Sequence, residues 1–177
     1  MSPISWTTPR TWVSGETPTA AQFNAHVRDN LNFLYGAPAC RVYHNAAQAI
    51  ATATSTAVAC NSERFDNDTM HSTVTNNSRI TFTTAGRYLV VVNIEFAANA
   101  TGYRHCQIAY YGVAVIAAEI LPIVDSTATT VLNVAAIYSF AAAGQAVCDV
   151  IQTSGGNLNV NSTSNYSPEF MAHWMGN

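Results

Sequence analysis

Charged residues are scarce in this chain of 177 residues, and lysine is absent altogether. Charged side chains make up 10 % of the sequence, against about 25 % in an average soluble domain. The net charge of −3 gives no basic footprint to neutralise phosphates, so nucleic acid is excluded as an expected partner. Such a surface suits extensive contacts between subunits, because little charge has to be desolvated when they form. A neutral, Thr/Asn-rich β protein without these contacts explains the composition equally well.

Long hydrophobic runs are missing too. No segment approaches the roughly 20 apolar residues of a membrane-spanning helix, so we expect no membrane insertion. Residues 1–10 lack the basic start and the apolar core of a secretory signal peptide. We therefore expect no export through the secretory route.

The usual motifs of catalysis and cofactor binding are absent as well. The five histidines show no HxxxH or HExxH spacing, and the sequence contains neither a GxSxG elbow nor a glycine-rich phosphate loop. The ten acidic residues are scattered, and nothing in the sequence pairs two of them as glycoside hydrolysis requires. We expect no enzymatic activity and no cofactor.

The four cysteines form no CxxC pair, so a zinc site is not expected. Cys106 shares its alternation with Ile108 and Tyr110, which predicts a buried position. Spacing alone proposes no pairing, and one or two disulfides remain open among Cys40, Cys60, Cys106 and Cys148.

One acidic segment has side chains of the kind that bind calcium. Residues 63–68 (Glu-Arg-Phe-Asp-Asn-Asp) bring several oxygen ligands close together in the chain, and hard cations prefer such ligands. A polar loop whose Asp and Asn side chains cap turns gives the same pattern, and we favour it. We predict no bound metal, with Asp66 and Asp68 as the candidate ligands should a calcium ion bind.

The first 36 residues differ in character from the rest. Residues 1–18 are an arm with three prolines. Thr19 and Gln22 have the spacing of a capping box, and apolar residues then recur at helical spacing as far as Gly36, a natural helix end. This predicts one helix of about four turns. Alone it would be marginal in water, so it must pack on the domain, on copies of itself or on another protein.

Two tryptophans in the arm indicate a contact with a partner. Tryptophan is a frequent anchor in protein–protein contacts, because its large ring is costly to leave in water. The alternative is an arm that folds back on its own domain. Together with the apolar stripe of the helix, the predicted anchoring residues are Trp6, Trp12, Phe23, Val27, Leu31 and Leu34.

Beyond Gly36 the hydrophobic period changes to two. Residues 79–104 show this best: a short strand, a turn at Ala85-Gly86, and alternating apolar residues over 88–96. Such alternation is typical of a half-buried antiparallel strand. Leu89 and Val91 also make the opposite face apolar, so we expect a neighbouring subunit to cover them.

Further alternating runs separated by Gly/Asn turns, with no second helix, predict an all-β antiparallel sandwich or jelly roll. Residues 46–59 are expected to form strand, loop and strand. In the last run Met171, His173 and Met175 share one face, and they join Leu89 and Val91 as predicted subunit contacts. The other runs cover residues 40–44, 80–82, 106–110, 132–140, 158–160 and 170–174.

A set of short motifs within these strands and turns resembles a known family. The motifs are Arg79-Ile-Thr-Phe, Ala85-Gly-Arg-Tyr88, Phe96, Gly102-Tyr-Arg104, Ala143-Gly144, Gln152-Thr-Ser-Gly155 and Ser167-Pro-Glu-Phe170 with Trp174. From residue 40 to 177 their order resembles the C1q/TNF-like trimeric jelly roll. The resemblance implies a C1q/TNF-like head over residues 37–177 that assembles as a homotrimer.

The N-terminal region carries a second, independent resemblance. It lies in Thr8-Pro-Arg-Thr-Trp12-Val-Ser-Gly15-Glu16, Thr19-Ala-Ala-Gln-Phe-Asn24 and Val27-Arg28-Asp29-Asn30-Leu31. These residues are similar to the N-terminal segment of many small virion proteins of tailed bacteriophages, which often carry a C1q-like head behind it. One departure is Tyr111-Gly112, where many phage heads have an Asn-Gly turn.

The combined resemblance implies an accessory structural protein of the phage particle, made in the bacterial cytoplasm and anchored in the virion by residues 1–36. Its partners would be its own copies and other virion proteins. Its place stays open between capsid decoration and a minor tail protein at the tail tip. A receptor- or carbohydrate-binding adhesion head that contacts the host surface is the alternative.

Overall fold

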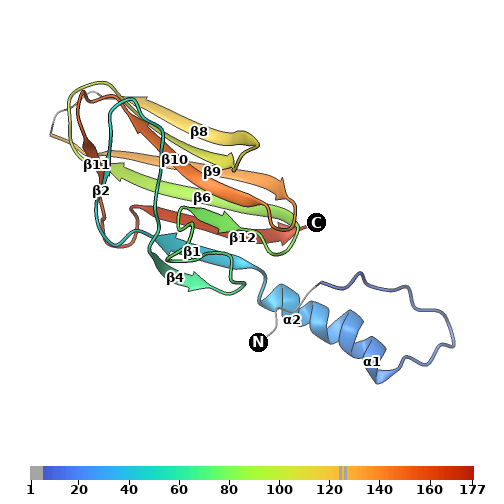
Figure 1. Ribbon diagram of the computed structural model, residues 1–177. Helices are drawn as coiled ribbons and strands as arrows, with labels where there is room; N and C mark the ends of the chain where they lie inside the picture. The colour runs from blue at the N-terminus through green and yellow to red at the C-terminus, as the bar shows by residue number, and fades with distance from the viewer. Residues whose placement is uncertain (1–5, 124, 126) are drawn as a thin grey trace.

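The N-terminal helix forms where its capping signal predicts it. In the computed structural model, which describes residues 6–123, 125 and 127–177, the Thr19 hydroxyl accepts the Gln22 N–H, and the Gln22 side chain accepts the Thr19 N–H. The helix then runs without a break through α1 (Ala20–Phe23), a π-helical turn η1 (Asn24–Arg28) and α2 (Asp29–Tyr35). It projects from one end of a β sandwich (Figure 1).

Twelve strands follow within the described residues, and they form two antiparallel sheets. The strands are β1 (Ala39–Tyr43), β2 (Gln48–Ile50), β3 (Thr56–Ala57), β4 (Ser62–Asp66), β5 (Arg79–Thr81), β6 (Gly86–Phe96), β7 (Tyr103–Tyr110), β8 (Ala114–Pro122), β9 (Thr130–Phe140), β10 (Gln145–Gln152), β11 (Leu158–Val160) and β12 (Glu169–Gly176).

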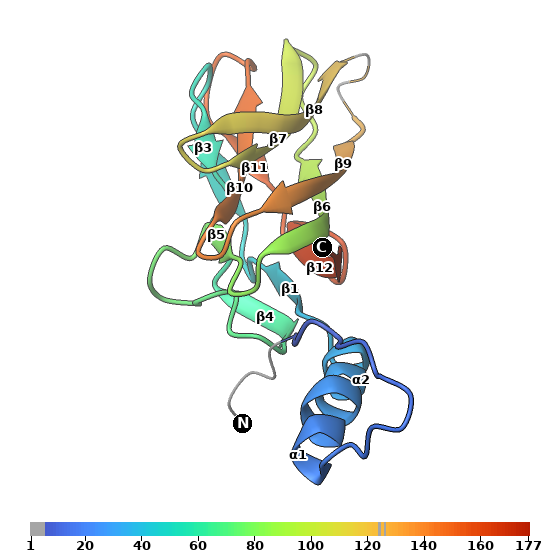
Figure 2. The same ribbon diagram turned by 90° about the vertical axis from the view of Figure 1, so that its right-hand side faces the viewer.

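The larger sheet has the order β2-β11-β6-β12-β1-β4, with β9 along the other side of β6; the smaller has the order β3-β10-β7-β8, with β5 beside β10. Figure 2 shows the two layers with the helix below them. Consecutive strands therefore often lie in different sheets, as they do in a jelly roll. The predicted class, an all-β antiparallel jelly-roll sandwich preceded by one helix, is confirmed.

The core lies between the sheets, and its side chains come from the predicted strand phases. The inward face of β6 is buried from Tyr88 to Phe96 at every second residue. At the helix end of the sandwich, the Phe82 ring stacks on Phe140 with centroids 3.9 Å apart and packs on Tyr88 at 4.3 Å. Aromatic side chains bury more apolar area than other residues, so this cluster is a major part of the core.

Gly86, the first residue of β6, cannot be replaced without movement of the backbone. Its φ is +145°, which L side chains rarely adopt, and an added Cβ would lie 2.4 Å from Trp174 Nε1 and 2.8 Å from the carbonyl oxygen of Gly176. Gly86 therefore allows the start of β6 to lie directly against the end of β12.

Two strands differ from the sequence prediction. The segment 63–68, predicted as a polar loop, contributes the edge strand β4, which pairs with β1. Its side chains lack an apolar period because an edge strand with mostly exposed residues needs none. Strand β8 was not predicted either, since its Ala-rich sequence shows no alternation; it pairs with β7 after a turn in which Gly112 has a φ of +71°.

All four cysteines are buried free thiols, with at most 1 % of each residue exposed. Burial raises the pKa of Cys60 to about 12 and that of Cys40 still further, so neither forms the reactive thiolate near neutral pH. The Sγ atoms of Cys106 and Cys148 lie 3.8 Å apart as a thiol pair.

We expect no reaction of the native protein with Ellman's reagent at pH 8, and reaction of all four thiols in denaturant. Fast labelling of a native thiol would contradict this burial.

Candidate subunit and docking surfaces

The predicted subunit contacts lie together on the outer face of the larger sheet. Val91 pairs with Met171 and Leu89 with His173 across β6 and β12. Their side chains alternate with the buried residues of the same strands, so they point away from the core. We call the five predicted residues on this face, Leu89, Val91, Met171, His173 and Met175, the outer-sheet patch.

Apolar side chains from neighbouring strands extend this patch. Ile137 of β9 pairs with Leu89 and is 59 % exposed, and Phe65 of β4 is 52 % exposed. A shallow hollow of about 240 Å³ lies among Phe65, the patch and the start of β1. Ile137 was recognisable from the outward phase of its strand. Phe65 could not be recognised in this way, because the sequence predicts a loop for its segment.

The loop 161–167 covers part of the far half of the same face. Glu95, which is buried on this face of β6, accepts hydrogen bonds from the side chains of Asn161, Thr163 and Tyr166. Burial opposes ionisation of Glu95, but these hydrogen bonds outweigh it and lower the pKa of its carboxyl group. Glu95 thus holds the loop over the sheet as a carboxylate.

Glu169 fastens the other side of this loop. Its carboxylate is 1 % exposed and lies 2.9 Å from Arg41 Nε and 3.0 Å from an Arg64 guanidinium nitrogen. The two guanidinium groups also donate to the backbone carbonyls of Asn165 and Ser164. The loop is thus fixed over β6 and β12 in the far half of the face, whereas the outer-sheet patch nearer the helix is left open by the chain's own loops.

The acidic segment considered for calcium is occupied by internal hydrogen bonds. The Asp66 carboxylate accepts the backbone N–H groups of Asp68 and His71, and the Asp68 carboxylate accepts the Thr83 hydroxyl. The Glu63 carboxylate pairs with His71. In the described parts of the chain, no group of three or more His, Cys, Asp or Glu residues is arranged to hold a metal ion.

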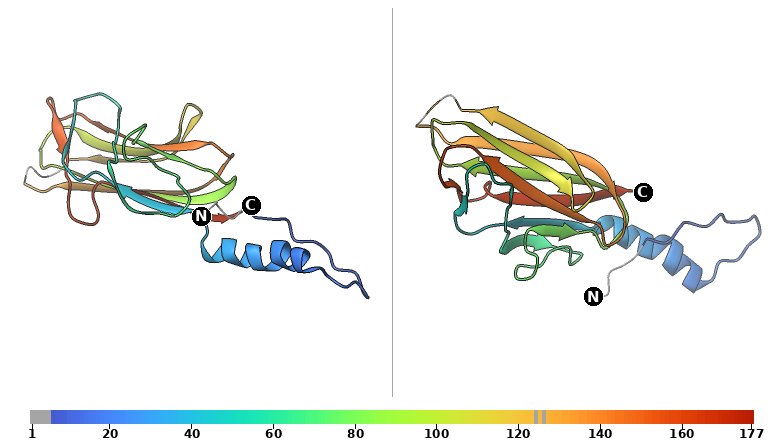
Figure 3. Two further views of the ribbon diagram at one scale, coloured as in Figure 1. Left: turned by 60° about the horizontal axis from the view of Figure 1, so that its bottom comes forward. Right: turned by 45° about the horizontal axis from the view of Figure 1, so that its top comes forward.

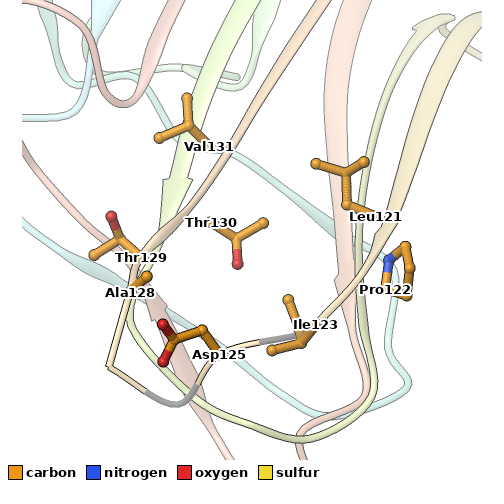
Figure 4. Close-up of a pocket in the computed structure, with 8 residues that line it drawn as sticks. All are labelled: Leu121, Pro122, Ile123, Asp125, Ala128, Thr129, Thr130 and Val131. Atoms are coloured by element: carbon orange, nitrogen blue, oxygen red, sulfur yellow. The ribbon is translucent and has the colours of Figure 1, made fainter.

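A cavity of about 360 Å³ opens at the end of the sandwich opposite the helix (Figure 4). The end of β8 and the start of β9 frame it, with Leu121 and Val131 as apolar walls and Thr129, Thr130 and Asp125 as polar ones. Such a mixture of apolar surface and a few polar groups is typical of a small-ligand site. The sequence did not point to this cavity, since its residues form no motif.

The helix packs on the sandwich through residues outside its predicted stripe. Phe33 is buried with its ring centroid 4.9 Å from Trp174, at the end of β12. The predicted stripe instead faces solvent, with between 38 % and 61 % of each residue exposed. We call these four residues, Phe23, Val27, Leu31 and Leu34, the helix stripe. None of the described helices is long and apolar enough to cross a lipid bilayer.

The arm folds back along the helix, which is the alternative considered for its tryptophans. Trp6 packs on Phe33 with centroids 6.0 Å apart, near the sandwich. Trp12 stacks on Phe23 at 5.7 Å, at the other end of the helix, and remains 39 % exposed. Figure 1 shows the arm running outward beside the helix before it turns back into it. The anchoring role of these residues stays a prediction.

Asn30 holds the arm in this position. Its side-chain oxygen accepts the Thr7 N–H at 2.9 Å, and its nitrogen donates to the Thr7 carbonyl at 2.7 Å. We expect Asn30→Ala to release the arm, since about 1 kcal/mol is lost for each hydrogen bond. Limited proteolysis should then cleave residues 6–18 at least several-fold faster than in the control Asn32→Ala, which changes an exposed asparagine two positions further along the helix. Equal cleavage rates would contradict this role.

Comparison with solved structures identifies the fold as C1q/TNF-like. The chain is similar to murine APRIL (TM-score 0.59, 10 % identity, 78 % of this chain and 98 % of that one), to the Eiger TNF of S. frugiperda (0.57, 12 %, 79 % and 95 %) and to the globular domain of zebrafish complement 1qA (0.54, 12 %, 79 % and 99 %). No family model and no curated protein matches the sequence. At this level of identity the likeness shows the fold alone.

Proposed function

We propose that this protein is an accessory structural component of a tailed bacteriophage particle, a non-enzymatic homotrimeric head anchored by its N-terminal arm and helix. The observation that supports the assembly is the outer-sheet patch, an apolar surface that a single chain leaves open. Contiguous apolar surface of this kind marks an interaction site. The phage assignment is supported by the sequence similarity of residues 8–31.

A closed ring of identical copies covers every such patch. When each chain places a different surface on the patch of the next, rotation about one axis closes the ring and leaves no patch exposed. The exposed apolar residues of β8, Val115 and Ile120, lie in the other sheet and offer the second surface. The C1q/TNF-like fold is the reason to expect three copies.

Anchoring by residues 1–36 is tested with a phage that lacks the gene for this protein. Complementation with the full chain should restore its incorporation into virions. A chain that starts at residue 37 should fold, as judged by circular dichroism, but should be lost from purified particles. Normal incorporation of the shortened chain would refute the anchoring role. The copy number per particle then decides its place, since hundreds indicate the capsid and a few trimers indicate the tail.

A receptor- or carbohydrate-binding head is the second candidate, and the cavity between β8 and β9 favours it. This cavity (Figure 4) lies at the end of the sandwich opposite the helix (Figure 1), which an anchored head would present to the host. Binding of the full protein to a glycan array, lost in Thr130→Arg, would support this function. No binding to host cells or glycans would leave the structural role alone.

A further inference from the structure

The π-helical turn changes the meaning of the spacing in the helix stripe. The stripe residues are separated by four, four and three positions. A coiled coil needs apolar residues at alternating steps of three and four. The π turn, Asn24–Arg28, begins directly after Phe23 and contains Val27. Such a turn takes up one extra residue. The first step of four therefore acts as a step of three, and the stripe has the three-four-three order of a coiled-coil seam.

One other face of the helix is occupied by its own chain, and the face around Asn24, Arg28 and Asn32 is polar and exposed. Phe33 and Asn30 are buried against the sandwich and the arm. Arg28 and Asp29 pair with each other at 2.8 Å beside the stripe, and the stripe itself contains no charge. What covers the stripe must therefore be apolar and narrow, which fits another helix better than a flat sheet.

The helix stripe and the outer-sheet patch lie at the same end of the molecule. The patch occupies the half of the sheet where β12 ends and β6 begins, and the end of β12 contacts the helix through Trp174 and Phe33. In the left view of Figure 3 the helix lies on the side of the larger sheet that faces away from the smaller one. Copies brought together by the patch therefore also bring their helices together.

We propose that two further copies of the same stripe cover each helix stripe, so that the three helices of the trimer form a short left-handed coiled coil. This inference rests on the proposed homotrimer and extends it. A groove of about 200 Å³ between the arm and the stripe, lined by Trp6, Pro9 and Leu31, accommodates side chains of the neighbouring helix. Tyr35, which follows the last stripe residue, is 97 % exposed and adds apolar surface at this end of the helix. Contact with the particle then falls to the outer side of the arm, around Trp12 and Val13.

Cysteine cross-linking of the full-length chain tests this arrangement. Leu31→Cys places a thiol in the seam, whereas Asn32→Cys places one at the next residue, on the exposed side of the helix. Thiols in one layer of a coiled coil are close enough to be joined, and thiols on the outer sides are too far apart. After mild oxidation with copper phenanthroline, about two of every three Leu31→Cys chains should run as covalent dimers, because three symmetric thiols allow one pair. Asn32→Cys and the wild-type chain, whose own thiols are buried, should stay monomeric on the gel.

The same samples are analysed by sedimentation, which separates this inference from the proposed trimer. A trimer in which Leu31→Cys cross-links no better than Asn32→Cys overturns the coiled coil and leaves the trimer standing. A monomeric wild-type chain overturns the trimer and the coiled coil with it. Selective cross-linking within a trimer supports both.

Discussion

Replacing Leu89 by aspartate is expected to turn the proposed trimer into monomers while each chain stays folded. Leu89 is at the centre of the outer-sheet patch, between His173 on one strand and Ile137 on the other. In the single chain it is 37 % exposed, so an aspartate there can still reach water. In the trimer the carboxylate would be enclosed by apolar side chains of two copies, at a cost of about 3 kcal/mol or more for each chain.

Val74→Asp is the matched control, since Val74 is 86 % exposed in a loop away from the patch. Sedimentation velocity at micromolar concentration should show monomers for Leu89→Asp and trimers for Val74→Asp. Both variants should keep the far-ultraviolet circular dichroism of the wild type. A trimeric Leu89→Asp protein would place the subunit contact elsewhere on the head.

Replacing Glu169 by glutamine should cause the largest loss of fold stability among single isosteric changes. One amide nitrogen would then face a guanidinium group in place of a carboxylate oxygen, and two cations would share one neutral acceptor. Removing one partner of a fully buried ion pair costs about 3–5 kcal/mol. Because the side chains of Arg41 and Arg64 are 32 % and 28 % exposed, water recovers part of this, and we expect a loss of about 2–3 kcal/mol.

Glu16→Gln is the control for this variant, because Glu16 forms an ion pair of the same kind with Arg10 in the arm, partly open to water. Exposed pairs contribute about 1 kcal/mol at most. Urea unfolding of the head should therefore show a midpoint clearly below that of the wild type for Glu169→Gln. The midpoint of Glu16→Gln should be almost the same as that of the wild type. Equal midpoints would mean that the loop 161–167 is held without Glu169.

The sequence was sufficient to predict the fold class because burial imposes a period on most strands. Strand β6 shows this best, since one side of it faces the core along its whole length and each inward position must be apolar. The helix start was predictable for a similar reason: a capping box is a local interaction over four residues. The placement of Leu89, Val91, Met171 and His173 on one surface followed from the same alternation, once β6 and β12 were found to be neighbours.

Features that depend on distant partners could not be predicted. Arg104 is fully buried, and its guanidinium donates to the backbone carbonyls of Asn99, Thr101 and Tyr103. The sequence does not show which backbone carbonyl groups accept these hydrogen bonds, because every residue has a backbone carbonyl group. The ion pairs of Glu169 join residues more than a hundred positions apart. The π turn is a feature of backbone hydrogen bonding, and the spacing of the apolar residues alone does not locate it.

The arm illustrates a further limit. Two tryptophans among prolines favour a contact, but the pattern does not say with what. The structure shows Trp6 and Trp12 on the helix of their own chain, through contacts that Asn30 fixes with two hydrogen bonds. What the arm presents to a partner is therefore its outer side, and not the ring faces that pack inward.

The mass of the full-length protein in solution tests the central claim most directly. Sedimentation equilibrium at micromolar concentration should give three times the chain mass of 19.0 kDa, with no lighter species down to the detection limit. A single species with the mass of one chain would contradict the trimer, and with it the role given to the outer-sheet patch.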